Sequence, residues 1–115
     1  MSQECIFCKI AAKQIPAQIV YEDEQMLVFR DLNPVAPEHV LLIPKRHIPS
    51  LRKMAAEDQP AVNAVMAAVP QVANLLGLTE AGFRLVTNTG EDGGQTVGHL
   101  HWHLMGGRKM TWPPG

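Results

Sequence analysis

The strongest pattern of hydrophobic and polar positions runs over residues 58–76. Valine, methionine, alanine and leucine recur there at intervals of three and four residues, which places one apolar stripe of a helix against a core. Asp58 is placed to cap this helix, Pro60 lies in its first turn, and Gly77 follows its end. Because Pro70 removes a backbone hydrogen bond inside the pattern, we expect one long, bent helix.

The first half of the chain holds short apolar runs that predict strands. Residues 19–21 and 26–31 are separated by the acidic turn 22–24, which indicates a hairpin. Residues 39–44 (HVLLIP) form a nearly continuous apolar run bounded by proline on both sides. Such a run is typical of a strand buried on both faces, so we place it in the middle of a sheet.

The two ends of the chain complete the set of expected elements. Residues 5–13 predict a short helix that stops before the Ile15-Pro16 pair. Residues 83–88 and 97–105 have the composition of strands, and the glycine-rich stretch 90–94 gives the backbone freedom that a tight connection needs. Because nothing alternates as βαβ, the sequence predicts an α+β fold, with helices packed on an antiparallel sheet of about five strands.

Length, composition and charge narrow the class of protein. The 115 residues and the 46% hydrophobic content suit one domain with a single core, over residues 1–115. A formal net charge of −1 gives no broad electrostatic attraction for nucleic acid or anionic lipid, so neither is expected as a partner. No apolar run approaches the roughly 20 residues that span a bilayer, and the first residues lack the pattern of a signal peptide. We therefore expect a cytoplasmic protein that recognises any phosphate locally.

Three histidines alternate near the end of the chain. In a strand, His99, His101 and His103 would share one face at steps of roughly 6.6 Å. A single histidine on a strand is usually structural, but three on a face that valine could fill point to binding or chemistry. A tri-histidine metal site is an alternative, although rings roughly 13 Å apart at the backbone would need strong curvature to share one ion. The opposite, packed face of this strand would carry Leu100, Trp102 and Leu104.

The segment Gly93-Gly94-Gln95-Thr96 lies immediately upstream of these histidines. It can present backbone N–H groups and one hydroxyl toward the histidine face. Converging amides in a glycine-rich loop are a common way to hold a phosphate without a cluster of Lys and Arg. Beside the three histidines, this loop indicates a phosphate site.

The segment 88–108 (NTGEDGGQTVGHLHWHLMGGR) resembles the signature of the histidine triad (HIT) nucleotide-binding family. The resemblance extends to its Hint branch of purine nucleoside phosphoramidases through residues 6–10, 15–16, 29–31, 42–47 and the terminal 112–115. It implies a HIT-like fold with one long and one short helix, assembled as a homodimer. The implied activity is hydrolysis of the P–N bond in purine nucleoside 5′-phosphoramidates, of the adenosine 5′-monophosphoramidase type.

The resemblance also implies catalytic roles for the histidines. His101 would attack the α-phosphorus and form a nucleotidyl-histidine that water resolves. His103 would contact the phosphate and assist proton transfer to the leaving group, while His99 supports the nucleophilic ring from behind. The hydroxyl of Thr96 stands where relatives usually carry serine, and its extra methyl group could alter proton transfer. No cofactor is required for this chemistry.

Further residues match the family's nucleotide-binding positions. Asn88, Gly94, Gln95 and Thr96 would hold the α-phosphate, together with His101 and His103. Asp31 would accept hydrogen bonds from the ribose hydroxyls. The slot for the base would be lined by Ile6, Phe7, Ile15, Phe29 and Leu32, although each could equally be plain core. Adenine and guanine are not distinguished by such a slot.

Other positions leave alternatives open. Trp112 would reach the partner's leaving-group pocket in the homodimer, or it belongs to a frayed end. Cys5 and Cys8 are spaced as a metal site or a redox pair, and with His47 and His99 they match the structural zinc site of some relatives, which the Hint branch commonly lacks. Gly98 replaces an aromatic residue of close relatives, and His39 is expected at a strand edge without a role.

Two other functions remain in competition with phosphoramidate hydrolysis. The first is hydrolysis of dinucleoside polyphosphates, as in the Fhit branch, which uses the same chemistry. The second is a nucleotide-binding adaptor in which turnover is vestigial. The Trp-Pro-Pro-Gly ending at residues 112–115 favours the phosphoramidase.

Overall fold

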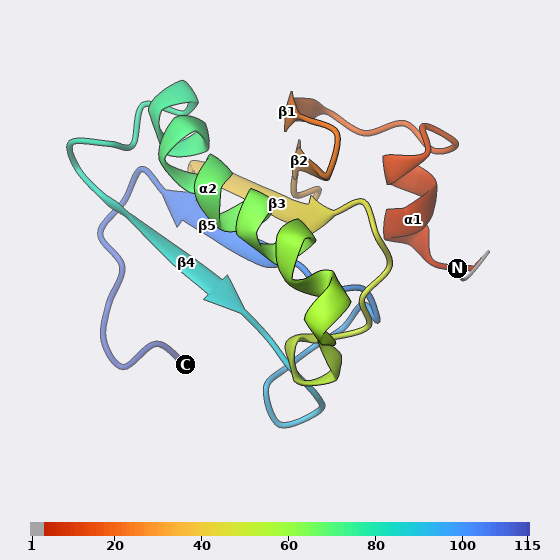
Figure 1. The fold of residues 1–115 in the computed structure, drawn as a ribbon. Helices are drawn as coiled ribbons and strands as arrows, with labels where there is room; N and C mark the ends of the chain where they lie inside the picture. Colours follow the sequence, from red (N-terminus) through yellow and green to blue (C-terminus); the bar gives the residue numbers. More distant parts are fainter. Residues whose placement is uncertain (1–3) are drawn as a thin grey trace.

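A computed structural model describes residues 4–115 of the chain (Figure 1). It contains a five-stranded sheet in the order β1-β2-β3-β5-β4, in which every neighbouring pair is antiparallel. One long and one short α-helix accompany the sheet, so the predicted α+β fold class is confirmed. The elements are α1 (Ile6–Ala11), β1 (Ile19–Glu22), β2 (Met26–Arg30), β3 (Glu38–Pro44), α2 (Gln59–Leu75), β4 (Phe83–Thr87) and β5 (Trp102–Gly106), with 3-10 turns at Leu51–Lys53 and Ala56–Asp58.

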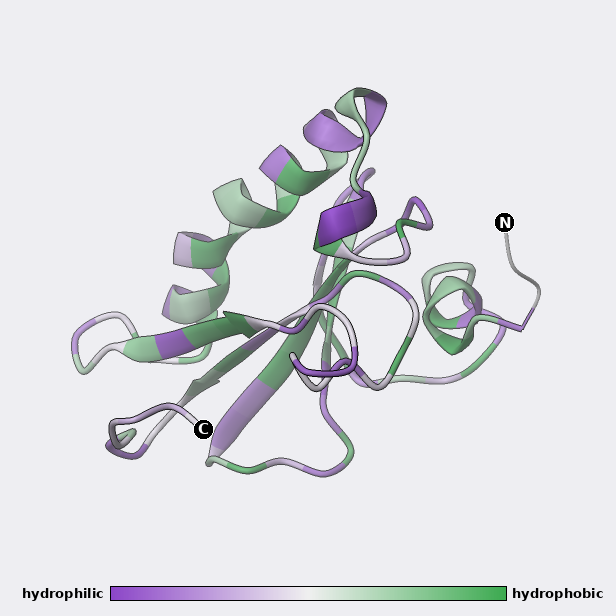
Figure 2. Cartoon of the chain, turned by 90° about the horizontal axis from the view of Figure 1, so that it is seen from below, coloured by the Kyte–Doolittle hydropathy of each residue, from purple (hydrophilic) through white to green (hydrophobic). Residues whose placement is uncertain are grey.

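Strand β3 occupies the middle of the sheet, as its continuous apolar sequence predicts. Its side chains alternate between two packed layers. On one face they join the core beneath α2, which crosses the sheet, and hydrophobic and polar residues alternate along this helix (Figure 2). On the other face Leu41 and Ile43 pack against Phe7 and Ile10 of α1. The candidate site lies on this second face.

The long helix runs from Gln59 to Leu75, close to the predicted range, and Pro70 lies inside it. The expected cap at Asp58 is wrong in detail. Asp58 occupies the N-cap position, but its carboxylate accepts hydrogen bonds from the Ala55 N–H at 2.9 Å and the Arg46 Nε–H at 2.6 Å. These donors lie outside the helix, so Asp58 joins the helix to the preceding turn and to Arg46. None of the helices in residues 4–115 has the length and apolar character needed to span a bilayer.

The last strand is shorter than predicted, because it pairs with its neighbours only from Trp102 onward. The pairing of β5 with both β3 and β4 begins at Trp102, opposite Leu42 and Thr87. Upstream, Leu100 donates a single backbone hydrogen bond to the Ile48 carbonyl, and residues 97–99 form a bend. The connection after β4 is therefore a long loop, and the expected tight hairpin is wrong. Alternation nevertheless persists, since Leu100, Trp102 and Leu104 all join the core under α2.

Candidate functional site

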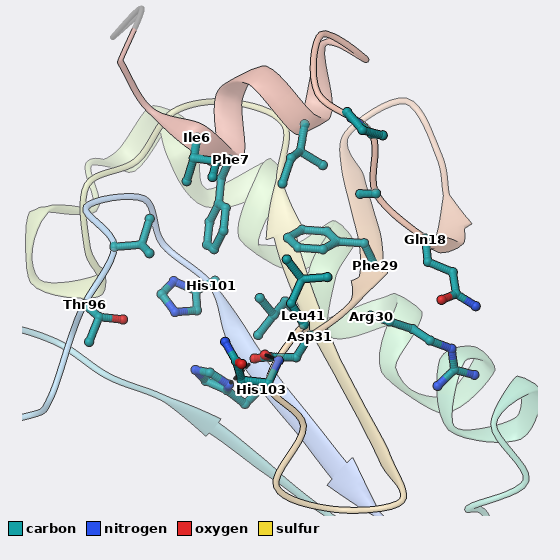
Figure 3. Close-up of a pocket in the computed structure, with 16 residues that line it drawn as sticks. Ile6, Phe7, Gln18, Phe29, Arg30, Asp31, Leu41, Thr96, His101 and His103 are labelled. Atoms are coloured by element: carbon teal, nitrogen blue, oxygen red, sulfur yellow. Dashed lines mark hydrogen bonds and ion pairs between the residues drawn. The ribbon is translucent and has the colours of Figure 1, made fainter.

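A cavity of about 410 Å³ opens between α1, the end of β2 and the segment that leads into β5 (Figure 3). Its volume falls within the range typical of small-molecule sites. Asp31, Thr96, His101 and His103 form its polar end. Most of the expected base-slot residues line its apolar part: Ile6, Phe7, Phe29 and Leu32.

The apolar part of the cavity is built on aromatic contacts. The ring of Phe7 meets Phe29 edge-on at 5.5 Å between centroids and meets His101 in the same way at 5.1 Å. Ile6 is 47% exposed and Leu32 94% exposed, so both have apolar surface left for a ligand. Ile15 lies elsewhere, packed against the cluster that includes Phe7, and does not line the cavity.

His101 is held by the backbone in a defined orientation. Its Nδ1 lies 2.7 Å from the carbonyl oxygen of His99, which can only accept, so Nδ1 carries the proton. In the neutral ring Nε2 therefore keeps its lone pair, as a nucleophile requires. The side chain is only 4% exposed, yet it lines the cavity between Phe7 and His103 (Figure 3).

His103 belongs to a chain of hydrogen bonds that starts at the backbone. The Val35 N–H donates to Nδ1 of His39 at 3.1 Å, so the neutral His39 ring carries its proton on Nε2. That proton faces Nδ1 of His103 at 2.9 Å. Nδ1 of His103 then accepts, and the neutral His103 ring carries its own proton on Nε2. His101 and His103 therefore offer opposite functions at their Nε2 atoms, a lone pair and a proton.

Burial favours the neutral forms of the two hydrogen-bonded histidines, His39 and His103. Desolvation is the main cause that lowers the pKa of His39 and of His103, and the nearby Asp31 carboxylate partly opposes it in both. The Asp31 Oδ2 lies 3.4 Å from Nε2 of His39 and 4.0 Å from Nδ1 of His103. These three atoms converge like metal ligands. However, the Val35 N–H places the His39 proton on the atom that would have to bind, so we interpret the group as a proton chain.

His39 is the residue that the sequence reasoning missed. It lies near the start of the central strand, as expected, but it is 5% exposed and makes hydrogen bonds that the sequence did not predict. The alternation of side chains along the strand could have revealed that His39 faces the candidate site. His39 shares a face with Leu41, and Leu41 pairs directly with His103 in the sheet.

The loop before β5 is braced by its own side chains. Gln95 accepts a hydrogen bond from the Gly90 N–H at 3.0 Å, and its amide nitrogen donates to the carbonyls of Pro49 at 2.8 Å and Val97 at 3.0 Å. The Asn88 amide donates to the Gly93 carbonyl at 2.6 Å. Of the expected phosphate-binding residues in this loop, Thr96 lines the cavity, while Asn88, Gly94 and Gln95 lie in the loop without lining it.

His99 faces away from the cavity, toward a second cluster. Its Nε2 lies 2.8 Å from the Pro44 carbonyl and therefore carries the proton, which leaves the Nδ1 lone pair free. The Nδ1 atom of His99 lies 3.3 Å from the Cys5 Sγ and 3.5 Å from the Cys8 Sγ. His47 completes the group, with its Nδ1 3.2 Å from the Cys8 Sγ. The structure thus divides the three alternating histidines between two clusters, and it brings His99 together with Cys5, Cys8 and His47, the alternative set that the sequence offered.

The four ligand atoms of this Cys-His cluster suit a tetrahedral metal. Zinc bonds of about 2.3 Å to sulfur and 2.0–2.1 Å to nitrogen imply S–N separations of roughly 3.5 Å, close to those present. Burial, helped by the neighbouring Cys5, raises the pKa of the Cys8 thiol to about 11. Burial also lowers the pKa of His99 to about 4, so this ring is neutral. A cation would stabilise the thiolate forms, and the donor set fits zinc.

Trp112 lies in the C-terminal tail and is 80% exposed. It does not line the cavity of its own chain. The side chain therefore presents a large exposed apolar surface.

The comparisons with known proteins agree with this fold. Residues 12–110 match the family model described as the HIT domain, and the chain therefore belongs to the HIT family. Protein HitA from Neisseria gonorrhoeae is 58% identical over 102 residues, covering 89% of this chain and 94% of HitA.

Solved structures give the same result. A HIT family hydrolase from Legionella pneumophila has a TM-score of 0.93 at 47% identity, covering 97% of this chain and 100% of that chain. A histidine triad protein from Clostridium difficile has a TM-score of 0.92 at 43% identity, covering 96% of each. These similarities support hydrolysis as the general class of reaction.

Proposed function

We propose that this protein is a nucleotide-binding hydrolase that cleaves purine nucleoside 5′-phosphoramidates through a nucleotidyl-histidine on His101. One observation carries the proposal. His101 and His103 line the same cavity with their ring centroids 5.1 Å apart, and their backbone-imposed tautomers leave a lone pair on one Nε2 and a proton on the other. A nucleophile and a proton donor are the two groups that P–N cleavage needs.

The cavity suits a nucleoside monophosphate. The base would lie against the apolar part, where Phe7, Phe29 and Ile6 present hydrophobic surface. The Asp31 carboxylate, 17% exposed, would accept hydrogen bonds from the ribose hydroxyls. This placement brings the α-phosphate to the polar end, beside His101 and His103.

The first chemical step forms the covalent intermediate. The Nε2 lone pair of His101 attacks the α-phosphorus, and the P–N bond to the leaving group breaks. The Nε2–H of His103 donates a hydrogen bond to the departing nitrogen, which takes its proton from a water molecule, so the amine departs neutral and the His103 ring also stays neutral. The chain from Val35 through His39 keeps a hydrogen bond on Nδ1 of His103 throughout and so maintains its orientation.

The second step releases the nucleotide. The hydroxide left by the water that protonated the amine attacks the phosphorus. The bond between phosphorus and His101 breaks, which restores the lone pair and yields the nucleoside monophosphate. The Thr96 hydroxyl would stabilise charge on the phosphoryl oxygens. The Gly94 and Gln95 N–H groups bond to the Glu91 and Gly90 carbonyls at 3.0 Å each and, with Asn88, fix the shape of the loop that presents Thr96.

The Cys-His cluster extends the proposal to a structural zinc held by Cys5, Cys8, His47 and His99. A bound zinc would neutralise the two thiolates and tie α1 to the segment before β5. His99 joins this cluster to the nucleophile, because its ring faces the sulfurs while its carbonyl accepts the hydrogen bond from His101. Catalysis itself does not pass through this cluster.

A homodimer completes the proposal. Strand β4 is an edge strand, and Phe83 within it is 40% exposed, so an unpaired edge and an apolar side chain are available for a second copy. The exposed Trp112 would then contact the leaving-group side of the partner's cavity. The purine preference and the cytoplasmic location stay predictions.

Substrate comparison tests the proposed function. Purified protein should hydrolyse adenosine 5′-phosphoramidate with a higher kcat/KM than a diadenosine polyphosphate. The reverse preference would assign the protein to the dinucleoside polyphosphate hydrolases. If His101→Ala rescued every cellular phenotype of a deletion, an adaptor role would replace catalysis.

A further inference from the structure

A second hollow, of about 390 Å³, adjoins the candidate phosphate site. It shares Thr96 and Val97 with the cavity of about 410 Å³ described above, here called the main cavity, so the two spaces meet at Thr96, which is expected to hold the phosphate. Its walls come from the 3-10 turn Leu51–Lys53 and from both ends of the glycine-rich loop. We call this hollow the cationic pocket, because Arg52 and Lys53 line it.

The charges in the cationic pocket have no partners. Within residues 4–115, neither Arg52 nor Lys53 makes a side-chain hydrogen bond or ion pair, and Glu91, which also lines the pocket, makes none either. By contrast, Arg30 pairs with Glu38 at 2.9 Å and Arg46 with Asp58 at 2.6 Å. The pocket thus has an uncompensated positive charge close to Thr96.

The position of Arg52 depends on a glycine. Gly90 has a positive φ of 74°, and a Cβ atom there would lie only 3.0 Å from Nη1 of Arg52. The guanidinium group therefore lies close over the start of the loop that ends at Thr96. The Gly90 N–H bonds to Gln95, which fixes this part of the loop.

Gly98 leaves the pocket open. A Cβ atom at this position would meet nothing within 4 Å, so a side chain here would point into free space. Gly98 also lines a neighbouring hollow of about 380 Å³, together with Thr96 and Val97. The absence of an aromatic side chain at this position leaves room beside the phosphate site for a group attached to the phosphorus.

We propose that the cationic pocket receives the leaving group and selects one that carries a negative charge, either a carboxylate or a phosphate. The inference rests on the proposed function, because in-line displacement sends the leaving group away from His101 across the phosphorus. A nucleotide in the main cavity would direct this group past Thr96. Arg52 supplies a planar pair of donors that match the oxygens of either anion, and Lys53 adds a second charge.

A matched pair of substrates tests the proposal. The adenosine 5′-phosphoramidates of 4-aminobutyrate and of butylamine have the same length but differ by a carboxylate. The wild-type protein should prefer the carboxylate substrate in kcat/KM. Arg52→Glu combined with Lys53→Glu should lower kcat/KM for the carboxylate substrate by about tenfold, a modest factor because exposed ion pairs are individually weak. The same double variant should lower kcat/KM for the butylamine substrate by less than about twofold, because that leaving group carries no charge for the pocket to bind. High salt should reduce the wild-type preference.

Lys109→Glu is the control, because this exposed lysine lines neither cavity and the substitution makes the same charge change as Lys53→Glu. It should leave the ratio of the two kcat/KM values unchanged. An equal effect of the double reversal on both substrates, or no effect on either, would overturn the proposal. The proposal would also be overturned if Lys109→Glu lowered the ratio of the two kcat/KM values as much as the double variant does.

A binding experiment separates this inference from the proposed hydrolysis and tests phosphate as the anion. His101→Asn removes the nucleophile, so dissociation constants for AMP and ADP can be measured without turnover. Adding Arg52→Glu and Lys53→Glu should weaken ADP by about tenfold while changing AMP by less than about twofold. Equal effects on the two nucleotides would exclude a phosphate-selective pocket, even if the wild-type protein cleaves no phosphoramidate. Failure of AMP itself to bind would instead contradict the proposed function.

Discussion

Two clusters of side chains meet on the segment that enters β5, and they use imidazole in opposite ways. Beside the main cavity, His39, His103 and His101 are arranged so that protons and lone pairs alternate on their ring nitrogens. In the Cys-His cluster, the Nδ1 atoms of His47 and His99 instead lie beside two sulfur atoms. A backbone carbonyl fixes the protonated nitrogen both in His101 of the first cluster and in His99 of the second. Alternate histidines of one short segment can therefore serve different chemistry.

The largest expected effect comes from removing the nucleophile. His101→Asn should reduce kcat by about 10⁴-fold or more, because it removes the Nε2 lone pair to which the account assigns the covalent attack. The dissociation constant for AMP should change little, since the cavity walls remain. Single-turnover kinetics and calorimetry would measure the two quantities. A variant that kept a tenth of the wild-type kcat would remove His101 from the nucleophile's role.

The hydrogen-bond chain gives the next largest effect. His39→Leu removes the donor to Nδ1 of His103 and should lower kcat by about 10²-fold with little change in KM, as expected for loss of positioned acid catalysis. His39→Gln can keep an N–H donor and should recover most of that loss. The two variants should also differ in the pH dependence of kcat. Equal activity of both would show that His39 only fills space.

Breaking the Cys-His cluster should mainly reduce stability. A metal present at a thousandfold excess over its dissociation constant stabilises the fold by about 4 kcal/mol. A chelator should therefore lower the Tm of the wild-type protein, while Cys8→Ser should begin with a lower Tm and respond little to chelator. Zinc content and calorimetry provide the measurements. A wild-type protein that purifies without zinc and whose Tm ignores added zinc would refute the metal site.

The smallest expected effect is on the pH dependence of stability. Burial lowers the pKa of His39 below 6.5, so below that pH the unfolded chain binds more protons than the folded one. The free energy of unfolding should fall as the pH drops through 6.5. The contribution of His39 should stop growing below its folded-state pKa, while His99, whose pKa is lowered to about 4, extends the decline. Urea unfolding at several pH values would show this decline, and His39→Gln should flatten it. An unchanged slope in the variant would mean that other groups cause the decline.

Local pattern predicted much of the fold and part of the site. The apolar run of β3 implied a central strand, and the spacing in α2 implied a helix of nearly the observed length. The alternation of histidines with Leu100, Trp102 and Leu104 correctly placed these three residues in the core, opposite the cavity that His101 and His103 line. These features depend on residues close together in the sequence, where periodicity is informative.

The features that were missed depend on partners distant in the sequence. The start of β5 at Trp102 is set by where β3 and β4 cease to pair with it. The separation of His99 from His101 follows from the Pro44 carbonyl and the sulfur atoms near the N-terminus. Likewise, the Asp58 carboxylate bonds to Arg46 across the preceding turn. Periodicity along one segment carries no information about such contacts.

The stereochemistry at phosphorus tests the central claim most directly. An adenosine 5′-phosphoramidothioate of defined configuration would be hydrolysed in ¹⁸O-labelled water, and the configuration of the product determined. Attack by His101 followed by attack of water makes two in-line displacements, so the account predicts net retention. Net inversion would mean that water attacks the substrate directly and that no nucleotidyl-histidine forms.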